Sequence, residues 1–218
     1  MRDPRIIFPE TGLIHTVRAK KGESPCLVFL IFLPSLLSAE KYPCKADPMK
    51  LPETERLLLR ELNPGDTTFI IELLNSEGWI RFIGNRNMHT GEDALKYILN
   101  ITANYKKYGF GFYVVERKED AVPMGICGLV KREGLDDIDI GFAFLPGHTG
   151  QGYGYESAAA MLHHARSVLR IPRIVAITSK DNYPSQKLLE KIGLGFEGTI
   201  RIPGDKEELN LYAIDLSI

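Results

Sequence analysis

The pattern of hydrophobic positions divides the chain into two parts. Residues 1–48 show no clear amphipathic period, and their one long apolar run, residues 26–37, is interrupted by Pro34. That run is too short to cross a bilayer, which takes about 20 residues. Beyond it, apolar residues alternate as in strands or recur at helical spacing. We expect residues 1–48 to be a poorly ordered N-terminal extension or an upstream-start segment, and residues 49–218 to form one domain.

The second part reads as strands and helices. Apolar runs bounded by turn residues predict strands at residues 56–62, 111–116, 123–131, 137–145, 171–178, 196–201 and 208–214. Helical spacing and capping residues predict about four helices, at residues 66–75, 90–109, 155–165 and 182–192. Short connections join the second, third and fourth strands, which predicts an antiparallel meander. The fold class is therefore α/β (α+β), a mixed layer of sheet and helices.

A glycine-rich loop lies between the fourth strand and the third helix. Its glycines are Gly150, Gly152 and Gly154. The first N–H groups of a helix lack internal acceptors, and the helix dipole adds positive potential there. Glycines let such backbone groups approach a phosphate closely, because they carry no Cβ atom. The loop therefore predicts a phosphate site, with a glycine-rich turn that binds nothing as the alternative.

Two other phosphate-binding loops fit this segment poorly. A P-loop needs Gly-Lys-Ser/Thr, and no lysine lies between Lys131 and Lys180. The dinucleotide fingerprint G-x-G-x-x-G fails at Tyr155 and needs a βαβ unit, whereas this loop follows an antiparallel meander. A nucleotide-phosphate binder is therefore disfavoured.

Composition and charge narrow the classes of function. The formal net charge is −1, so no global positive field favours nucleic acid or an anionic membrane as a partner. The cysteines Cys26, Cys44 and Cys127 match no metal-binding spacing, and Cys127 lies in an apolar run typical of a buried thiol. We expect no nucleic acid, no membrane and no metal.

Four motifs, in this order, resemble those of a known family. They are Glu53-Thr54-Glu55-Arg56-Leu57-Leu58-Leu59-Arg60, Asp139-Ile140-Gly141-Phe142-Ala143-Phe144-Leu145-Pro146, Gly150-Gln151-Gly152-Tyr153-Gly154-Tyr155-Glu156, and Asn182-Tyr183-Pro184-Ser185 followed by Leu189-Glu190-Lys191-Ile192-Gly193. Over about residues 53–214 the chain resembles N-acetyltransferases of the GNAT superfamily. The subgroup it resembles is the RimJ/RimL type, the ribosomal-protein-alanine N-acetyltransferases.

This resemblance implies a fold and an activity. The fold is the GNAT fold, a mixed and mostly antiparallel sheet of six to seven strands with about four helices and splayed fourth and fifth strands. The activity is direct transfer of an acetyl group from acetyl-CoA, a co-substrate, to a primary amine in a ternary complex. The acceptor is a protein N-terminus or a small-molecule amine, and the enzyme is cytoplasmic and a monomer or homodimer. A non-catalytic acyl-CoA-binding regulatory module is the alternative.

The resemblance also assigns contacts to coenzyme A. Its diphosphate is expected on the glycine loop, its pantetheine arm between the splayed strands, and a backbone N–H of Phe144 or Leu145 on the thioester carbonyl. The expected cofactor-binding residues are Phe144, Leu145, Thr149, Gly150, Gln151, Gly152, Tyr153, Gly154, Tyr155 and Asn182. Thr149 stands where most members of the superfamily have Arg or Gln.

The catalytic residues expected from the resemblance are Asn182 and Ser185, as donors to the departing thiolate. They lie three residues apart at the start of a helix, and Asn182 also fits a capping role. Leu189 lies near the position where many members have a tyrosine acid. Asp139 and Glu156 are candidates for the proton acceptor, although each also fits a structural charge, so the base stays unassigned.

Overall fold

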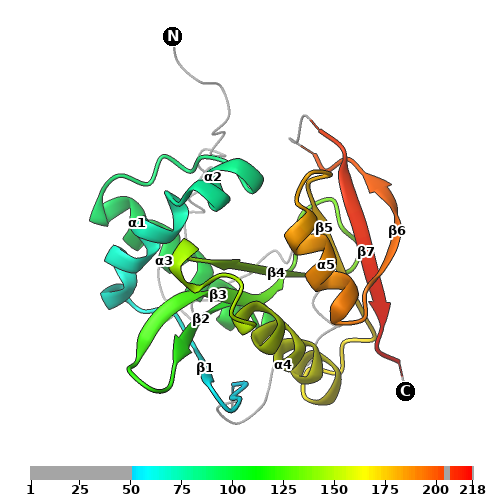
Figure 1. Ribbon diagram of the computed structural model, residues 1–218, viewed down its shortest axis with the longest axis horizontal. Helices are drawn as coiled ribbons and strands as arrows, with labels where there is room; N and C mark the ends of the chain where they lie inside the picture. Colours follow the sequence, from blue (N-terminus) through cyan, green and yellow to red (C-terminus); the bar gives the residue numbers. More distant parts are fainter. Residues whose placement is uncertain (1–50, 204–206, 218) are drawn as a thin grey trace, which may run out of the picture. The chain divides into compact units, whose positions relative to one another are not determined.

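A computed structural model of the chain describes residues 51–203 and 207–217. The predicted N-terminal extension, residues 1–48, lies outside the described residues, as do Cys26 and Cys44. The described residues form a seven-stranded sheet with five α-helices and two short 3-10 helices (Figure 1). This mixed α/β architecture confirms the predicted fold class.

The elements follow one another in the predicted order. They are β1 (Leu57–Arg60), η1 (Pro64–Asp66), α1 (Thr67–Leu74), α2 (Glu77–Phe82), α3 (Gly91–Tyr108), β2 (Phe112–Arg117), β3 (Val122–Val130), β4 (Ile138–Phe144), η2 (Pro146–His148), α4 (Tyr153–Ser167), β5 (Arg173–Thr178), α5 (Tyr183–Lys191), β6 (Gly195–Ile200) and β7 (Leu209–Asp215). All predicted strands are present, and α2 is the helix that the sequence pattern did not indicate.

The strand order is β1-β2-β3-β4-β5-β7-β6, and every neighbouring pair is antiparallel except β4 and β5. These two strands are parallel, and they pair only at Ile138 with Ile174 and at Asp139 with Val175. Both strands continue beyond these pairs, β4 to Phe144 and β5 to Thr178, but they do not pair with each other there. The predicted splaying of the fourth and fifth strands is therefore confirmed, and it leaves a gap in the middle of the sheet.

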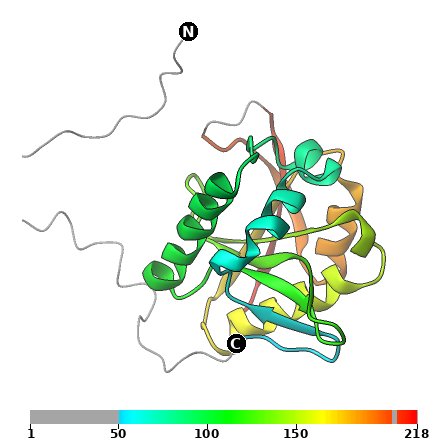
Figure 2. The same ribbon diagram turned by 90° about the vertical axis from the view of Figure 1, so that its left-hand side faces the viewer.

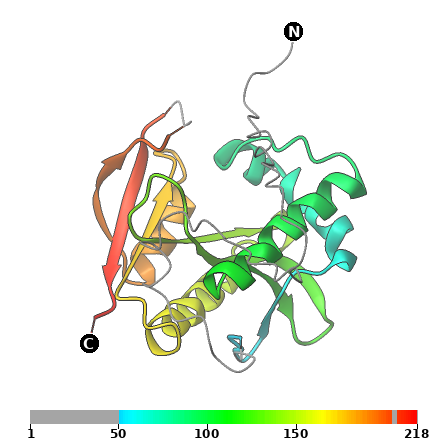
Figure 3. The same ribbon diagram turned by 180° about the vertical axis from the view of Figure 1, so that it is seen from behind.

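Helices cover both faces of the sheet, with α4 and α5 on one face and α1 and α3 on the other (Figures 1, 2 and 3). Ile138 and Ile140 of β4 belong to the core cluster that includes α4, whereas Ala143 packs against the cluster formed by α1 and α3. Side chains along β4 therefore alternate between the two faces of the sheet. No helix in the part of the chain described here is long and apolar enough to span a membrane.

The helix after the glycine loop begins earlier than predicted. Its first residue is Tyr153 rather than Tyr155, so Gly154 belongs to the first turn of α4. The N-cap is Gly152, whose φ of 86° is a left-handed conformation that glycine adopts without strain, and no side chain caps the helix. A side-chain cap is the usual sign of a helix start, so the residues here carry no clear signal for this boundary.

Candidate functional site

The hydrogen-bond directions of β4 show which of its amides face the gap. The N–H of Leu145 donates to the carbonyl of Met124 on β3, at 2.9 Å. Because these directions alternate along an antiparallel strand, the N–H groups of Phe144 and Phe142 are directed away from β3 and toward β5. Leu145 is therefore committed to the sheet, which corrects the prediction that its N–H is available to a thioester carbonyl. Phe144 remains available, and Phe142, which the sequence did not indicate, joins it.

The loop after β4 is held in shape by two of its own side chains. The Thr149 hydroxyl donates to the carbonyl of Pro146 at 3.0 Å, and Gln151 Nε2 donates to the carbonyl of Gly147 at 2.9 Å. Both side chains thus turn back onto the preceding 3-10 helix. The polar groups that the loop presents are therefore mainly those of its backbone.

The backbone of this loop presents a run of unpaired N–H groups. Gly150 and Gly152 have φ angles of 74° and 86°, which favour glycine. In the described part of the chain, no acceptor is found for the N–H groups of residues 150–155, and the first amide with a helical partner is that of Glu156, bonded to the carbonyl of Gly152 at 3.0 Å. Unpaired amides at the start of a 15-residue helix favour an anion.

Gly154 has a different role from the other two glycines. A Cβ atom there would lie 2.9 Å from Cδ1 of Leu188, on α5, whereas a Cβ atom at Gly150 would meet nothing within 4 Å. Gly154 therefore allows α4 and α5 to pack closely. The open surroundings of Gly150 leave room for a ligand against the loop.

Arg56, which lies directly before β1, fastens the loop to the start of that strand. Arg56 Nη2 lies 2.6 Å from Glu156 Oε2, and Arg56 Nη1 donates to the carbonyl of Gln151 at 3.3 Å. The guanidinium also lies over the ring of Tyr153, 4.6 Å from its centroid. Arg56 belongs to the first-strand motif, but its link to the loop was not predicted, since the partners lie far apart in sequence.

Glu156 has no oxygen left for catalysis. The Thr54 hydroxyl and the backbone N–H of Arg56 both donate to Oε1, while the Arg56 side chain occupies Oε2. Burial raises the pKa of this carboxyl, but the hydrogen bonds from Thr54 and Arg56 outweigh it and lower the pKa below its usual value. Of the two carboxylates considered as proton acceptors, Glu156 is therefore part of the loop's anchor.

Asp139 differs from Glu156 in both burial and bonding. It is 1% exposed, and both N–H groups of Arg132 that reach it, Nε at 3.0 Å and Nη2 at 2.7 Å, bond to Oδ2. Oδ1 has no hydrogen-bond partner among the described residues. Burial raises the pKa of Asp139 to about 6, against the opposing effect of Arg132. A buried carboxylate with one unpaired oxygen therefore lies where β4 and β5 separate.

The predicted catalytic pair, Asn182 and Ser185, lies at the start of α5, shortly after the end of β5. Asn182 is the N-cap of α5, and its Oδ1 accepts a hydrogen bond from the N–H of Ser185 at 3.2 Å. The capping role of Asn182 is therefore confirmed, and its side-chain amide and the Ser185 hydroxyl stay candidate donors. Leu189 is 2% exposed and packs in the core. The nearby Thr178 hydroxyl, which the sequence did not indicate, is buried without a partner in the described region.

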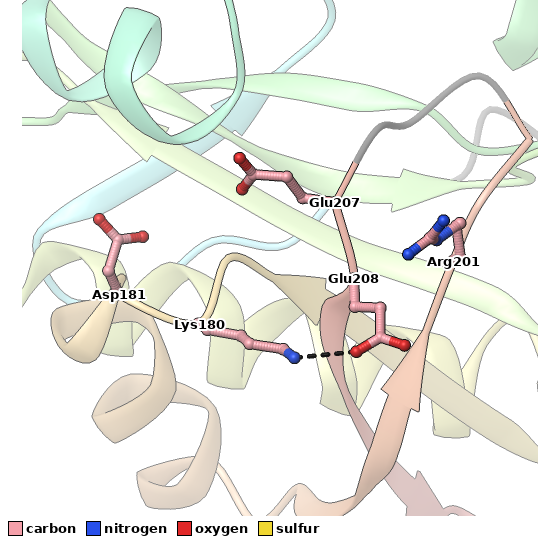
Figure 4. A pocket seen from close by; sticks show the side chains of 5 residues that line it. All are labelled: Lys180, Asp181, Arg201, Glu207 and Glu208. Atoms are coloured by element: carbon pink, nitrogen blue, oxygen red, sulfur yellow. Dashed lines mark hydrogen bonds and ion pairs between the residues drawn. The ribbon is translucent and has the colours of Figure 1, made fainter.

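A cavity of about 370 Å³ opens beside the turn between β5 and α5 (Figure 4). It is lined by Lys180, Asp181, Arg201, Glu207 and Glu208. Lys180 Nζ lies 3.0 Å from Glu208 Oε2, and Arg81 of α2 reaches Asp181 at 3.2 Å. The second ion pair links α2 to the turn between β5 and α5 next to the cavity.

Two further predictions concern Cys127 and metal binding. Cys127 is fully buried, and burial raises the pKa of its thiol to about 12, which confirms an inert structural cysteine. Within residues 51–203 and 207–217, no group of three or more His, Cys, Asp or Glu side chains could hold a metal ion.

Comparisons with known proteins point to one family. The family model described as an acetyltransferase (GNAT) domain matches residues 56–195. YnaD, an uncharacterized N-acetyltransferase of Bacillus subtilis, is 31% identical over 162 residues, covering 73% of this chain and 92% of YnaD. The crystal structure of a GNAT-family acetyltransferase from Bacillus anthracis is 27% identical, with a TM-score of 0.63 over 76% of this chain and 98% of that one.

A third protein is similar in fold alone. It is RimL, a ribosomal L7/L12 α-N-protein acetyltransferase solved in complex with coenzyme A. It is 20% identical to this chain, with a TM-score of 0.61 over 76% of this chain and 97% of RimL.

Proposed function

Since the chain belongs to the GNAT acetyltransferase family, we propose that it transfers an acetyl group from acetyl-CoA directly to a primary amine, as RimJ/RimL-type enzymes do. The proposed acceptor is a protein N-terminus or a small-molecule amine, and the proposed compartment is the cytoplasm, where acetyl-CoA is available. The observation that carries this proposal is the run of unpaired amides at residues 150–155 beside the gap between β4 and β5.

The loop suits a diphosphate. Its unpaired N–H groups supply donors, the start of α4 supplies positive potential, and Gly150 leaves the approach open. Arg56 holds the loop against β1 through Glu156 and the carbonyl of Gln151, so the donors are ordered before the ligand arrives. In this proposal residues 149–155 bind the diphosphate of coenzyme A, with Thr149 and Gln151 bracing the loop.

The gap suits the pantetheine arm. The N–H groups of Phe142 and Phe144 face it, and no strand pairs with them there. Acetyl-CoA supplies the activated acyl group, and a preorganised backbone N–H next to its carbonyl would stabilise the developing oxyanion. We assign this donor to the gap-facing side of β4.

The start of α5 is placed to assist the departing thiolate. Asn182 and Ser185 follow β5 directly, and β5 runs parallel to β4, so α5 and the glycine loop lie at the same end of the two strands. The Asn182 side-chain amide and the Ser185 hydroxyl are proposed to donate hydrogen bonds to the sulfur. These donors take the place of the tyrosine that many members of the family have, because Leu189 is buried and its side chain has no proton to donate.

Two measurements on the full chain test the proposal. Calorimetry should show binding of acetyl-CoA and coenzyme A but not of ATP. Thiol release from acetyl-CoA should then occur with at least one member of a panel of peptide N-termini and small amines. Binding of coenzyme A without turnover on any amine would indicate the non-catalytic acyl-CoA-binding module, and failure to bind it would refute the site.

A further inference from the structure

Tyr155 and Lys191 form a contact next to the glycine loop that no step of the proposed reaction uses. Lys191 Nζ lies 4.5 Å from the centroid of the Tyr155 ring. Tyr155 belongs to the first turn of α4 and is 40% exposed, and Lys191 is exposed as well. The negative face of an aromatic ring attracts a cation and so favours one position for the lysine side chain. An accessible ammonium group is therefore held beside the proposed diphosphate site.

The course of α5 shows where this contact lies relative to the coenzyme. α4 and α5 lie next to each other on one face of the sheet (Figure 1). α5 begins at its N-cap Asn182, which is proposed to donate to the sulfur. Further along, Leu188 packs against Gly154 of the glycine loop, where a Cβ atom would lie 2.9 Å from Leu188 Cδ1. Lys191, the last residue of α5, follows about one turn later.

The same order is found along coenzyme A. Its sulfur is joined through the pantetheine arm to the diphosphate, and the diphosphate is joined to a nucleotide whose ribose carries a 3′-phosphate. With the sulfur near Asn182 and the diphosphate on the glycine loop, the nucleotide end comes next along α5. The contact between Lys191 and Tyr155 lies at that place.

The charge of Lys191 is available to a ligand. Residues 149–155 contain no lysine or arginine, and Arg56, the cation that touches the loop, is bonded to Glu156 and to the carbonyl of Gln151. Among the residues that the structure describes, no carboxylate is paired with Lys191. The unpaired amides of residues 150–155 can serve the diphosphate, so the remaining phosphate of the nucleotide needs a donor from elsewhere.

We propose that the Lys191 ammonium group binds the 3′-phosphate of coenzyme A and that the Tyr155 ring positions it, an inference that rests on the function proposed above. Lys191 donates charge-assisted hydrogen bonds to the phosphate oxygens. The protein thereby distinguishes coenzyme A from its 3′-dephospho form, which has the same diphosphate and the same thiol. Because both residues are exposed, this preference weakens as the salt concentration rises.

Calorimetry of the full chain with coenzyme A and with 3′-dephospho-coenzyme A tests the proposal. Wild-type protein should bind coenzyme A about fivefold more tightly, in the range of an exposed charge pair. Lys191→Gln should reduce this ratio to within about twofold by weakening the binding of coenzyme A alone. Tyr155→Phe keeps the ring and should keep the ratio, whereas Tyr155→Leu should lower it. Lys96→Gln, which removes a lysine from α3 on the other face of the sheet, is the matched control and should leave the ratio unchanged.

A second readout follows the phosphate itself. In phosphorus-31 NMR of the full chain with coenzyme A, the 3′-phosphate signal should titrate at lower pH with wild-type protein than with Lys191→Gln. The reason is that a nearby cation stabilises the dianion and lowers the pKa of the phosphate.

Three outcomes separate this role from the proposed function. A wild-type ratio near one, or equal weakening of both ligands in Lys191→Gln, would overturn the role of Lys191 and leave the acetyltransferase proposal standing. Wild-type protein that binds neither ligand would refute the coenzyme A site as a whole. Wild-type protein that prefers coenzyme A but acetylates no amine would support Lys191 and refute the proposed transfer.

Discussion

Arg56 and Glu156 form an ion pair of 2.6 Å that joins the residue directly before β1 to the first turn of α4. The same guanidinium holds the carbonyl of Gln151 and lies over the ring of Tyr153. Three features of the loop that presents unpaired amides thus depend on one side chain. The shape of the proposed diphosphate-binding loop therefore depends on a residue next to β1, the strand at one edge of the sheet.

Replacing Arg56 by Ala should weaken the binding of coenzyme A by about tenfold, or about 1.4 kcal/mol, because the loop loses its anchor before the ligand binds. Calorimetric titration of the variant measures this. Lys96→Ala is the control, since it removes an exposed ion pair with Glu92 on α3. An unchanged Kd in Arg56→Ala would show that the loop needs no support from β1.

Substitutions at two glycines of the loop should affect coenzyme A binding and protein stability differently. Gly150→Ala adds a side chain in open space at a φ of 74°, so we expect a stability loss of about 1 kcal/mol and weaker binding of coenzyme A. Gly154→Ala places its Cβ 2.9 Å from Leu188 Cδ1 and should cost about 1–3 kcal/mol by overpacking. Thermal unfolding and calorimetry of both variants measure the two effects. Partial recovery in Gly154→Ala by Leu188→Ala would support the packing explanation, and its absence would contradict it.

Much of the fold could be predicted because its signals are local. Thr90 and Asp93 form the reciprocal cap that starts α3, and Gly109, with a φ of 77°, ends it as expected. The alternation along β4 and the short turns of the meander likewise lie within a few residues of one another. The start of α4 was placed late because a bare glycine cap carries no side-chain signal.

The site could be predicted only in part, because its decisive contacts are not local. The glycine loop and the start of α5 are visible in sequence as motifs. Arg56 and Glu156, however, are separated by 100 positions, and neither segment carries a sequence signal that predicts the contact. The available amides of β4 depend on its pairing with β3, and the free oxygen of Asp139 depends on how Arg132 approaches it.

The Asn182 side chain both caps α5 and is a candidate hydrogen-bond donor to the thiolate. One substitution can test the two roles separately. Asn182→Asp keeps the oxygen that accepts from the N–H of Ser185 at 3.2 Å but loses the amide donor. We expect stability within about 0.5 kcal/mol of wild type and turnover lowered by at least about tenfold. Asn182→Ala should lose both, with about 1 kcal/mol of stability. Steady-state kinetics and thermal unfolding measure this, and full activity in Asn182→Asp would remove the side chain from the mechanism.

Ser185 offers a donor without a structural role for its side chain. Its backbone N–H completes the cap by donating to Asn182 Oδ1. Ser185→Ala should therefore reduce kcat and leave the unfolding midpoint and the Kd for coenzyme A unchanged. Kinetics identical to wild type would assign the thiolate donor elsewhere, with the buried Thr178 hydroxyl as the next group to replace.

The buried carboxyl of Asp139 should make stability depend on pH. Its pKa is about 6 in the folded protein and 3.8 as a model group, so the folded state binds more protons than the unfolded state between these values. Stability therefore falls as pH rises from about 4 through about 6, by roughly 2–3 kcal/mol from this group. Asp139→Asn, which cannot ionise, should lack this loss and gain on wild type as the pH rises. Urea unfolding of both proteins at pH 5 and pH 7.5 measures the difference, and a difference that is equal at the two pH values would mean that the carboxyl titrates normally.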